Sequence, residues 1–573
     1  MMSNLGLGGT VRGHWPALFM AAAALLIGIG YAALLTPFEG FDEYGYYSSI
    51  RQVADTGTLP FYPNSVIDKN MLSYLDNGPM PWTSVKPPFE SLGRMTYPAF
   101  FGNADAVARY QDYRRLPADW VFAPSSVVNW EARHPPLYSV LMAPVMRLTE
   151  SLPLVTQVFV LRLISYLLAF AGLMLGWFVT RAETLPEGVA DGYLFFPLIV
   201  PMFFGEFVRI GGDGLCALLL GMAYSLTFPV LYRHEPGLKS AFALGICLGL
   251  GLLTKAFFLP VLASYACLLA LRLWRARRDT AAFHLWTAAS LLVLIPAMVL
   301  GGGWYVYELF AHGASIGSFE TVSLAEHGGL IANLRQKFSF YEFARQMMIT
   351  VASWSWGGSG SLTRISPVLH LPLLALTAWI VLSYLIAAWR NPANGRAWLP
   401  VWLVVPVFGG LVYHNLVSIA LGGGGTPGWY LNILAPFLAL ATGLGIARIN
   451  AGAAGRRVLG VSLIYAAVFL LAVIWSQIAL VTGCAIKSEA KYYQFSGHLF
   501  CLDHLPTVFD RLSVVAWPVP GFISIGAGFI CLAVALRSFF TGRGELDSTG
   551  RGELHPEPAF VGGGERAALE DAT

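Results

Sequence analysis

ALFMAAAALLIGIGYAALL, residues 17–35, is followed after one threonine by PFEGFDEYGYY, residues 37–47. The first stretch is an uncharged apolar run that is long enough to cross a bilayer as a helix. The second places three carboxylates, Glu39, Asp42 and Glu43, among aromatic residues at the predicted water boundary of the membrane. An aromatic belt with a few solvated charges is common at such a boundary, whereas ionisable groups held in a membrane cavity are usually functional. The rest of the chain has to decide between these two interpretations.

Composition assigns the whole chain to the membrane. Of its 573 residues, 56% are hydrophobic and only 12% are charged, and the mean hydropathy is +0.60. A soluble domain could not keep so apolar a chain dispersed. The formal net charge of +3 is too small to indicate a nucleic-acid partner. The sequence therefore predicts an all-α polytopic membrane protein.

Apolar runs of span length recur along the chain and, with the first run, predict about twelve transmembrane helices. The first run is expected to be a retained signal anchor, because its apolar part is longer than that of a signal peptide and no small-residue cleavage site follows. The further runs cover residues 157–180, 191–209, 213–232, 240–255, 257–272, 284–305, 367–389, 398–421, 428–447, 458–481 and 514–537.

Arginine and lysine residues are concentrated in alternate connections between these runs, most densely within residues 272–278. The positive-inside rule then places both termini in the cytoplasm. The predicted divisions are a cytoplasmic N-terminus with the first helix (1–36), a mixed external domain (37–155), transmembrane helices (156–305), an external loop (306–366), transmembrane helices (367–481), an external loop (482–513), the last transmembrane helix (514–540) and a disordered cytoplasmic tail (541–573).

The six cysteines fall into two groups. Cys484 and Cys501 bracket a polar stretch of a predicted external loop, where an oxidising exterior would let them form a structural disulfide. No spacing of cysteine and histidine in the sequence resembles a zinc site. The other four lie within apolar runs and are predicted to be small buried hydrophobes: Cys216, Cys247, Cys267 and Cys531.

Two cations are candidates for binding an anion on the external side. Arg209 and Lys255 lie at the predicted external ends of apolar runs, where the positive-inside rule makes cations scarce, so they favour capture of an anion such as a phosphate. For Lys255 taken in isolation, snorkelling of an interfacial lysine is the favoured interpretation. Glu206 and Asp213 place acids on both sides of Arg209.

Two further segments of the external domain add candidates. Residues 50–60 predict a short interfacial helix that is ended by Gly57 and Pro60, and an acid at the start of such a helix is stabilised by unpaired N–H groups. Residues 134–138, HPPLY, are stiffened by two prolines and could direct His134 and Tyr138 toward the first acids. A turn that caps a helix explains this second segment as well.

Taken in order along the chain, four motifs resemble those of the C-type membrane glycosyltransferases (GT-C). They are residues 41–43 (FDE), 134–138 (HPPLY), 209–213 (RIGGD) and 249–255 (GLGLLTK). The chain is similar in particular to bacterial relatives of the protein O-mannosyltransferases and of the lipid A aminoarabinose transferase. Residues 353–360 (SWSWGGSG) and 427–431 (PGWYL) are similar to elements of a related bacterial family. The ordered set is far more specific than any single motif.

The resemblance implies a membrane bundle, an external first-loop domain that carries the acids, and a cavity at the outer face of a bacterial inner membrane. It implies a polyprenyl-phosphate sugar donor, a lipid, glycan or protein acceptor, and transfer with inversion. No cofactor is required, and a divalent cation is optional, because the leaving group is already a lipid phosphate. The roles carried over are Asp42 as the base, Glu43 as its support, Arg209 and Lys255 as phosphate ligands, and His134, Tyr138, Asp213, Trp429 and Tyr430 as substrate-binding residues.

Trp429 stands where these relatives carry an arginine, so one phosphate contact is expected to be missing or supplied from elsewhere. The glycine run at residues 422–425 before it is interpreted as a flexible connector, with a hinge for substrate access as the alternative.

Two other functional classes stay open at the level of the sequence. A transporter or flippase of a lipid-linked glycan would also have about twelve spans, but it is expected to carry charges within the spans or paired halves with broken helices. The notable charges here cluster at the external border instead. A non-catalytic glycan-binding scaffold is the second alternative.

Overall fold

The computed structural model describes residues 15–80, 95–186, 188–312, 324, 328–358, 365–391, 394–423, 425–484, 486–487, 493–494 and 499–541. The N-terminal residues 1–14 and the tail from residue 542, for which the sequence predicts cytoplasmic segments, lie outside this range.

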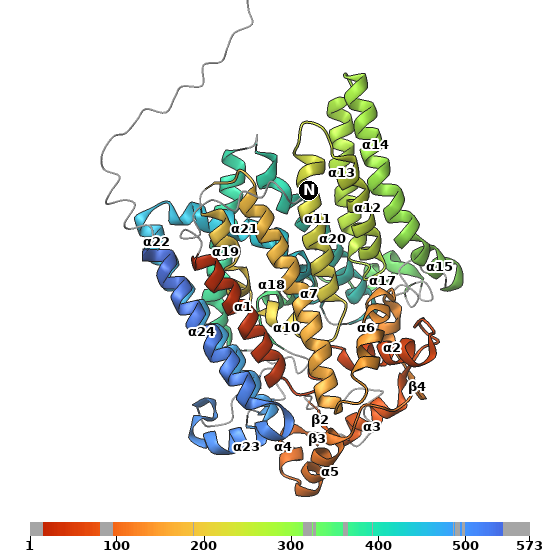
Figure 1. The fold of residues 1–573 in the computed structure, drawn as a ribbon, viewed down its shortest axis with the longest axis vertical. Helices are drawn as coiled ribbons and strands as arrows, with labels where there is room; N and C mark the ends of the chain where they lie inside the picture. Colours follow the sequence, from red (N-terminus) through yellow and green to blue (C-terminus); the bar gives the residue numbers. More distant parts are fainter. Residues whose placement is uncertain are drawn as a thin grey trace, which may run out of the picture.

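Ten helices within the described residues are long and apolar enough to cross a membrane, which confirms the predicted all-α polytopic class. Large apolar side chains such as Val405, Val461 and Ile530 are more than half exposed on their outer faces, as expected of a lipid-facing surface. The ten are α1 (Trp15–Leu34), α7 (Leu154–Ala182), α11 (Asp213–Leu231), α13 (Phe258–Ala276), α14 (Thr280–Ala297) continued by η4 (Met298–Gly302) and α15 (Gly303–His312), α19 (Pro367–Arg390), α20 (Gly395–Leu421), η5 (Gly428–Leu434) continued by α21 (Ala435–Asn450), α22 (Ala453–Val481) and α24 (Pro518–Thr541) (Figure 1).

The difference from the predicted number of spans has two local causes. Residues 191–209 do not form one helix but the short helices α8 (Val189–Tyr193), α9 (Phe196–Ile199) and α10 (Met202–Phe207). Pro197 and Pro201 interrupt this run, because proline lacks the backbone N–H that a continuous helix needs. The run predicted at 240–255 forms α12 (Leu238–Leu252), an apolar helix of only 15 residues.

The first and last helices of the bundle, α1 and α24, lie side by side (Figure 1). Their backbones approach so closely that a Cβ atom on Gly30 would lie 2.8 Å from the carbonyl oxygen of Gly521. Ser524 Oγ donates a hydrogen bond to the carbonyl of Leu26 at 2.7 Å. Small residues permit this kind of close packing between membrane helices.

The segment between α1 and α7 forms a group of short helices and strands at one end of the bundle (Figure 1). Strand β1 pairs antiparallel with β4, and β2 pairs parallel with β3. Helix α2 ends at Thr56, where Gly57 adopts the left-handed conformation (φ 69°), so the predicted helix stop is confirmed. The elements are α2 (Glu43–Thr56), β1 (Val66–Asp68), α3 (Lys69–Asn77), β2 (Pro79–Met80), β3 (Met95–Thr96), α4 (Tyr97–Phe101), α5 (Ala104–Arg115), β4 (Pro124–Val128), η3 (Trp130–Arg133) and α6 (Leu137–Leu148).

The remaining short elements lie in two later connections. Between α15 and α19 the described residues form α17 (Gly329–Lys337) and α18 (Phe340–Trp354). Between α22 and α24 they form β5 (Ile486–Lys487), β6 (Tyr493–Gln494), η6 (Leu499–His504) and α23 (Leu505–Val515).

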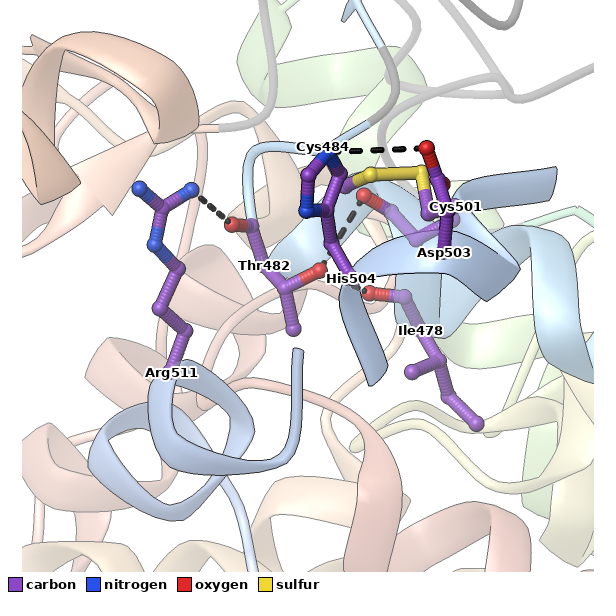
Figure 2. The surroundings of a disulfide bond; sticks show 8 residues. Ile478, Thr482, Cys484, Cys501, Asp503, His504 and Arg511 are labelled. Atoms are coloured by element: carbon purple, nitrogen blue, oxygen red, sulfur yellow. Dashed lines mark hydrogen bonds and ion pairs between the residues drawn. A yellow bond between two sulfur atoms is a disulfide. The ribbon is translucent and has the colours of Figure 1, made fainter. Parts of the chain in front are cut away.

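A disulfide joins Cys484 to Cys501, the pair predicted from the sequence, with Cα atoms 6.2 Å apart (Figure 2). Arg511 of α23 donates a hydrogen bond to the carbonyl of Thr482 at 3.1 Å, so α23 is attached beside the disulfide. Of the four cysteines predicted to be buried, Cys216 and Cys247 are buried, Cys531 is partly exposed and Cys267 is exposed, so the prediction is wrong for the last two.

Candidate active site

Asp42 occupies the N-cap position of α2 in a left-handed conformation, with φ 58° and ψ 13°. This conformation costs an L-residue about 1–2 kcal/mol, less for Asp and Asn, and such strain persists only where the surroundings fix it. Here Arg209 Nη1 donates to the carbonyl oxygen of Phe41 at 2.8 Å, and Glu43 is held on the other side. Asp42 is partly exposed, and its side chain makes no capping hydrogen bond to its own helix. The residue is therefore held in place through its neighbours.

Glu43 is fully buried, and its carboxylate accepts hydrogen bonds from three sides. Arg162 of α7 donates through Nε at 2.7 Å and through Nη2 at 2.5 Å, and the backbone N–H groups of Gly40 and Ile210 each donate at 2.9 Å. Arg162 also donates to two backbone carbonyls just after the end of α1, at 2.7 and 2.8 Å. This buried ion pair therefore fastens α1, α2, α7 and the segment before α11 to one another.

Two buried cations share the carboxylate of Asp213. Arg209 Nη2 lies 2.5 Å from Asp213 Oδ2, and Lys255 Nζ lies 2.7 Å from Asp213 Oδ1. Arg209 Nη2 also contacts Glu206 Oε1 at 2.9 Å. Because Lys255 is only 2% exposed and is ion-paired, the snorkelling interpretation of this residue is wrong.

Arg209 and Lys255 both have N–H donors that their ion pairs with Asp213 and Glu206 do not use. A lysine ammonium has three N–H donors, and Nζ of Lys255 lies 5.8 Å from the ring centroid of Tyr46 and 5.7 Å from that of Tyr430. Among the described residues, Nε of Arg209 and Oε2 of Glu206 are buried without a hydrogen-bond partner. Buried polar atoms are rarely left so, and these two atoms therefore mark a point where the hydrogen bonding of the Arg209 group is incomplete.

His134 and Tyr138 both lie against Tyr46 of α2. The rings of His134 and Tyr46 stack with centroids 6.0 Å apart, and the Tyr138 ring meets Tyr46 edge-on at the same distance. The Tyr138 hydroxyl shares a 2.7 Å hydrogen bond with Ser165 Oγ and accepts one from the N–H of Gly211 at 3.1 Å. The HPPLY segment is thus attached to α2, α7 and the segment that carries Arg209.

Glu131 of η3 is a buried acid beside this group. Its Oε2 lies 3.4 Å from His134 Nε2, and a Cβ atom on Gly45 would lie 2.7 Å from its Cγ. Burial, reinforced by the negative charge of Asp42, raises the pKa of Glu131 to about 7. Burial lowers the pKa of His134 well below its ordinary value, so the imidazole is neutral at pH 7.

Trp429 and Tyr430 reach the site from η5. The Trp429 ring stacks on Phe41, the residue before Asp42, with centroids 4.5 Å apart. Tyr430 packs on Phe257 with centroids 4.8 Å apart and faces Lys255. Because Trp429 is only 5% exposed, its ring packs against the segment that carries Asp42 and presents no open face to a ligand.

The structure joins all nine site residues predicted from the sequence into one connected set. Three participants were missed: Arg162, Glu131 and Tyr46. Arg162 lies within an apolar run, and a charge in such a run is itself a signal of function. Glu131 and Tyr46 carry no such signal, because acids and aromatic residues are ordinary at an interface. The described residues contain no group of three or more His, Cys, Asp or Glu side chains placed to hold a metal ion.

No family model matches the chain, and a search of curated protein sequences finds no match. Among solved structures, the chain aligns with ArnT from Cupriavidus metallidurans bound to undecaprenyl phosphate, at 12% identity and a TM-score of 0.43, over 94% of this chain and 80% of that one. It also aligns with the archaeal oligosaccharyltransferase AglB from Archaeoglobus fulgidus, in complex with an inhibitory peptide and a dolichol-phosphate. There the identity is 14% and the TM-score 0.38, over 85% of this chain and 57% of that one.

Proposed function

We propose that the chain is a membrane glycosyltransferase that moves a sugar, with inversion, from a polyprenyl-phosphate donor to a hydroxyl group of a lipid, glycan or protein acceptor. The observation that carries the proposal is the environment of Asp42. Asp42 is partly exposed, its backbone is held in a strained conformation, and its side chain makes no capping hydrogen bond to its helix. Arg209, whose Nε is unpartnered among the described residues, fixes the adjacent peptide. A base and an anion site thus share one segment.

In the proposed reaction, Asp42 accepts the proton of the acceptor hydroxyl, and the hydroxyl oxygen forms a bond to the anomeric carbon of the sugar. The bond between that carbon and the phosphate oxygen breaks, and polyprenyl phosphate leaves with the electron pair. Lys255 and Arg209 stabilise the negative charge on the departing phosphate. The rings of Tyr46 and Tyr430, which both face Lys255, border the space for the sugar.

Asp42 and Glu43 take different roles in this proposal. Glu43 is saturated by Arg162 and two backbone N–H groups, so it positions the segment and does not accept a proton. The leaving group carries its own phosphate, and no cofactor is part of the proposal. A divalent cation stays optional, and turnover of the purified protein before and after treatment with a chelator tests its role. The site is placed on the periplasmic face of a bacterial inner membrane, following the positive-inside pattern of the sequence.

Asp42→Asn tests the assignment of the base. Asparagine tolerates the left-handed conformation as aspartate does, so the substitution removes the charge and keeps the backbone. We expect transfer to fall by about 100- to 10,000-fold, with unchanged binding of undecaprenyl phosphate and unchanged thermal stability.

Cells that lack the protein, complemented with wild type or with the variant, supply their own substrate, so the test works whatever the sugar is. Mass spectrometry of their lipids, glycans and proteins should show one sugar-bearing species that wild type restores and Asp42→Asn does not. The matched control is Glu150→Gln, at an exposed acid of the same segment, which should restore the species fully. Full restoration by Asp42→Asn would show that Asp42 is not the base.

A further inference from the structure

Helix α18 has its polarity reversed relative to a helix on the surface of a soluble domain. Its buried face is polar and includes Gln346, Thr350 and Ser353. Its opposite face is apolar and exposed. The exposed fractions are 77% for Phe340, 76% for Tyr341, 69% for Met348 and 51% for Val351.

The buried polar face of α18 has partners in the segment that leads into η5. Thr350 Oγ1 donates to the carbonyl of Thr426 at 2.6 Å, and Ser353 Oγ accepts from the N–H of Gly428 at 2.8 Å. These contacts explain why polar residues face inward. The contacts do not account for the exposed apolar face of α18, which must be explained by what surrounds the protein.

Helix α17 fixes the position of α18 at the end of a membrane span. Leu330 and Leu334 of α17 pack with Val417 and Ala420, which lie in the last turns of α20. Lys337 Nζ donates to the carbonyl of Ala420 at 2.9 Å. The helix pair α17 and α18 is therefore attached at the end of a helix that is long and apolar enough to cross a membrane.

Basic side chains border this apolar face. Arg335 and Lys337 are exposed at the end of α17, directly before the exposed Phe338. Aromatic and aliphatic side chains with basic residues at their edge are the combination that binds the interface of a membrane that contains anionic lipids.

We infer that α17 and α18 form a membrane-interface element, in which Phe340, Tyr341, Met348 and Val351 enter the acyl-chain boundary of bilayer phospholipids. Arg335 and Lys337 lie at the level of their phosphate groups. Because the inner face of α18 holds the segment before Trp429 and Tyr430, the bilayer contacts the candidate active site through one helix. The occupant of the face is phospholipid, whatever reaction the protein catalyses.

Spin labels test the inference in the full chain, reconstituted in nanodiscs of phosphatidylethanolamine and phosphatidylglycerol. The free cysteines, Cys216, Cys247, Cys267 and Cys531, are replaced by alanine, and the disulfide is kept. A nitroxide at Met348→Cys or Val351→Cys should collide more often with oxygen, which concentrates in lipid, than with a water-soluble nickel complex. The matched control, Gln336→Cys at an exposed polar position of α17, should show the reverse order.

Preferential collision with the nickel complex at residues 348 and 351 would overturn the inference, and so would shielding of both labels from both reagents, which indicates a protein partner. A second measurement needs no substitution: photoactivatable phosphatidylglycerol in nanodiscs with the wild-type chain should form adducts within residues 338–354. Adducts confined to the membrane spans would overturn the inference. Neither measurement depends on sugar transfer, so its failure is distinct from failure of the proposed function.

Discussion

Asp42 and Glu43 are adjacent acids that the fold treats in opposite ways. Glu43 is 0% exposed and faces the guanidinium of Arg162, whereas Asp42 is partly exposed. The difference comes from the backbone, because the left-handed conformation at Asp42 turns the two side chains into different environments. From the sequence, Asp42 was predicted to be the base and Glu43 its support, but nothing in the sequence indicated that one acid would be buried and the other partly exposed.

Glu43→Gln should strongly destabilise the protein, because it leaves the buried charge of Arg162 without a partner. Loss of one member of a buried pair costs about 3–5 kcal/mol, to be measured by denaturant unfolding in detergent. The double variant Glu43→Gln with Arg162→Met should be less destabilised than the sum of the two single variants. The matched control is Glu342→Gln, in a surface pair with Arg345, for which the expected change is under about 1 kcal/mol. Equal effects of the two Gln variants would contradict a structural role for Glu43.

Glu131 should make stability depend on pH in a defined direction. Its pKa is raised from 4.5 to about 7 in the folded protein, so between these values the folded protein keeps a proton that the unfolded chain releases. Its contribution to stability is therefore complete below about pH 4.5, declines as pH rises to about 7, and is constant above that. Glu131→Gln should match wild type at the acidic end and exceed it by about 3 kcal/mol at pH 8.

Unfolding curves measured across this pH range check the expectation for Glu131. Glu150→Gln, at an exposed acid, should leave the pH dependence as in wild type. If wild type and Glu131→Gln differ by the same amount at every pH, folding does not raise the pKa of Glu131.

At the scale of elements, η5 positions its two aromatic residues through a close backbone contact with α18. A Cβ atom on Gly428 would lie 1.9 Å from the carbonyl oxygen of Thr350, which is impossible without movement. On the same segment, Gly423 accepts a hydrogen bond from Gln346 at 3.2 Å. The glycine run at 422–425 was interpreted from the sequence as a flexible connector. In the structure, α18 contacts this segment on both sides of residue 424, which itself lies outside the described range.

Gly428→Ala should displace Trp429 and Tyr430, and should lower both stability, by about 1–3 kcal/mol, and the rate of sugar transfer. Gly409→Ala in α20 is the matched control. A Cβ atom there meets nothing within 4 Å, so we expect stability to be unchanged or raised by up to about 1 kcal/mol, with normal transfer. Thermal unfolding and a transfer assay on both variants decide the matter. A normal rate of sugar transfer in Gly428→Ala would show that the position of η5 does not affect the reaction.

The sequence was sufficient for most elements, because apolar runs and basic connections are independent signals of membrane spans. It was insufficient at residues 191–209, where mean apolarity is that of a span but prolines divide the run into α8, α9 and α10. For the site, ordered motifs identified residues that the fold brings together, such as Arg209, Asp213 and Lys255. They could not show that Arg209 and Lys255 share the carboxylate of Asp213, because a shared carboxylate is a property of packing and not of spacing.

At the scale of the whole molecule, the disulfide should stabilise the last connection of the bundle. Cys484 and Cys501 are 17 residues apart, and closing a loop of this size contributes about 3 kcal/mol. Cys484→Ala with Cys501→Ala should lower stability by about this amount. A reductant should lower the stability of wild type to that of the double variant and leave the stability of the double variant unchanged. Thermal unfolding measures both. A loss of stability in the reduced double variant would point to another source of the effect.

The pairing of α1 with α24 has a consequence for assembly, because it joins two helices that lie far apart in the sequence. Helix α24 is synthesised later than the other described spans, so α1 gains the contact between Gly30 and Gly521 only after those spans have been made. A chain truncated before α24 therefore presents Asp42 at the end of a helix that lacks this support.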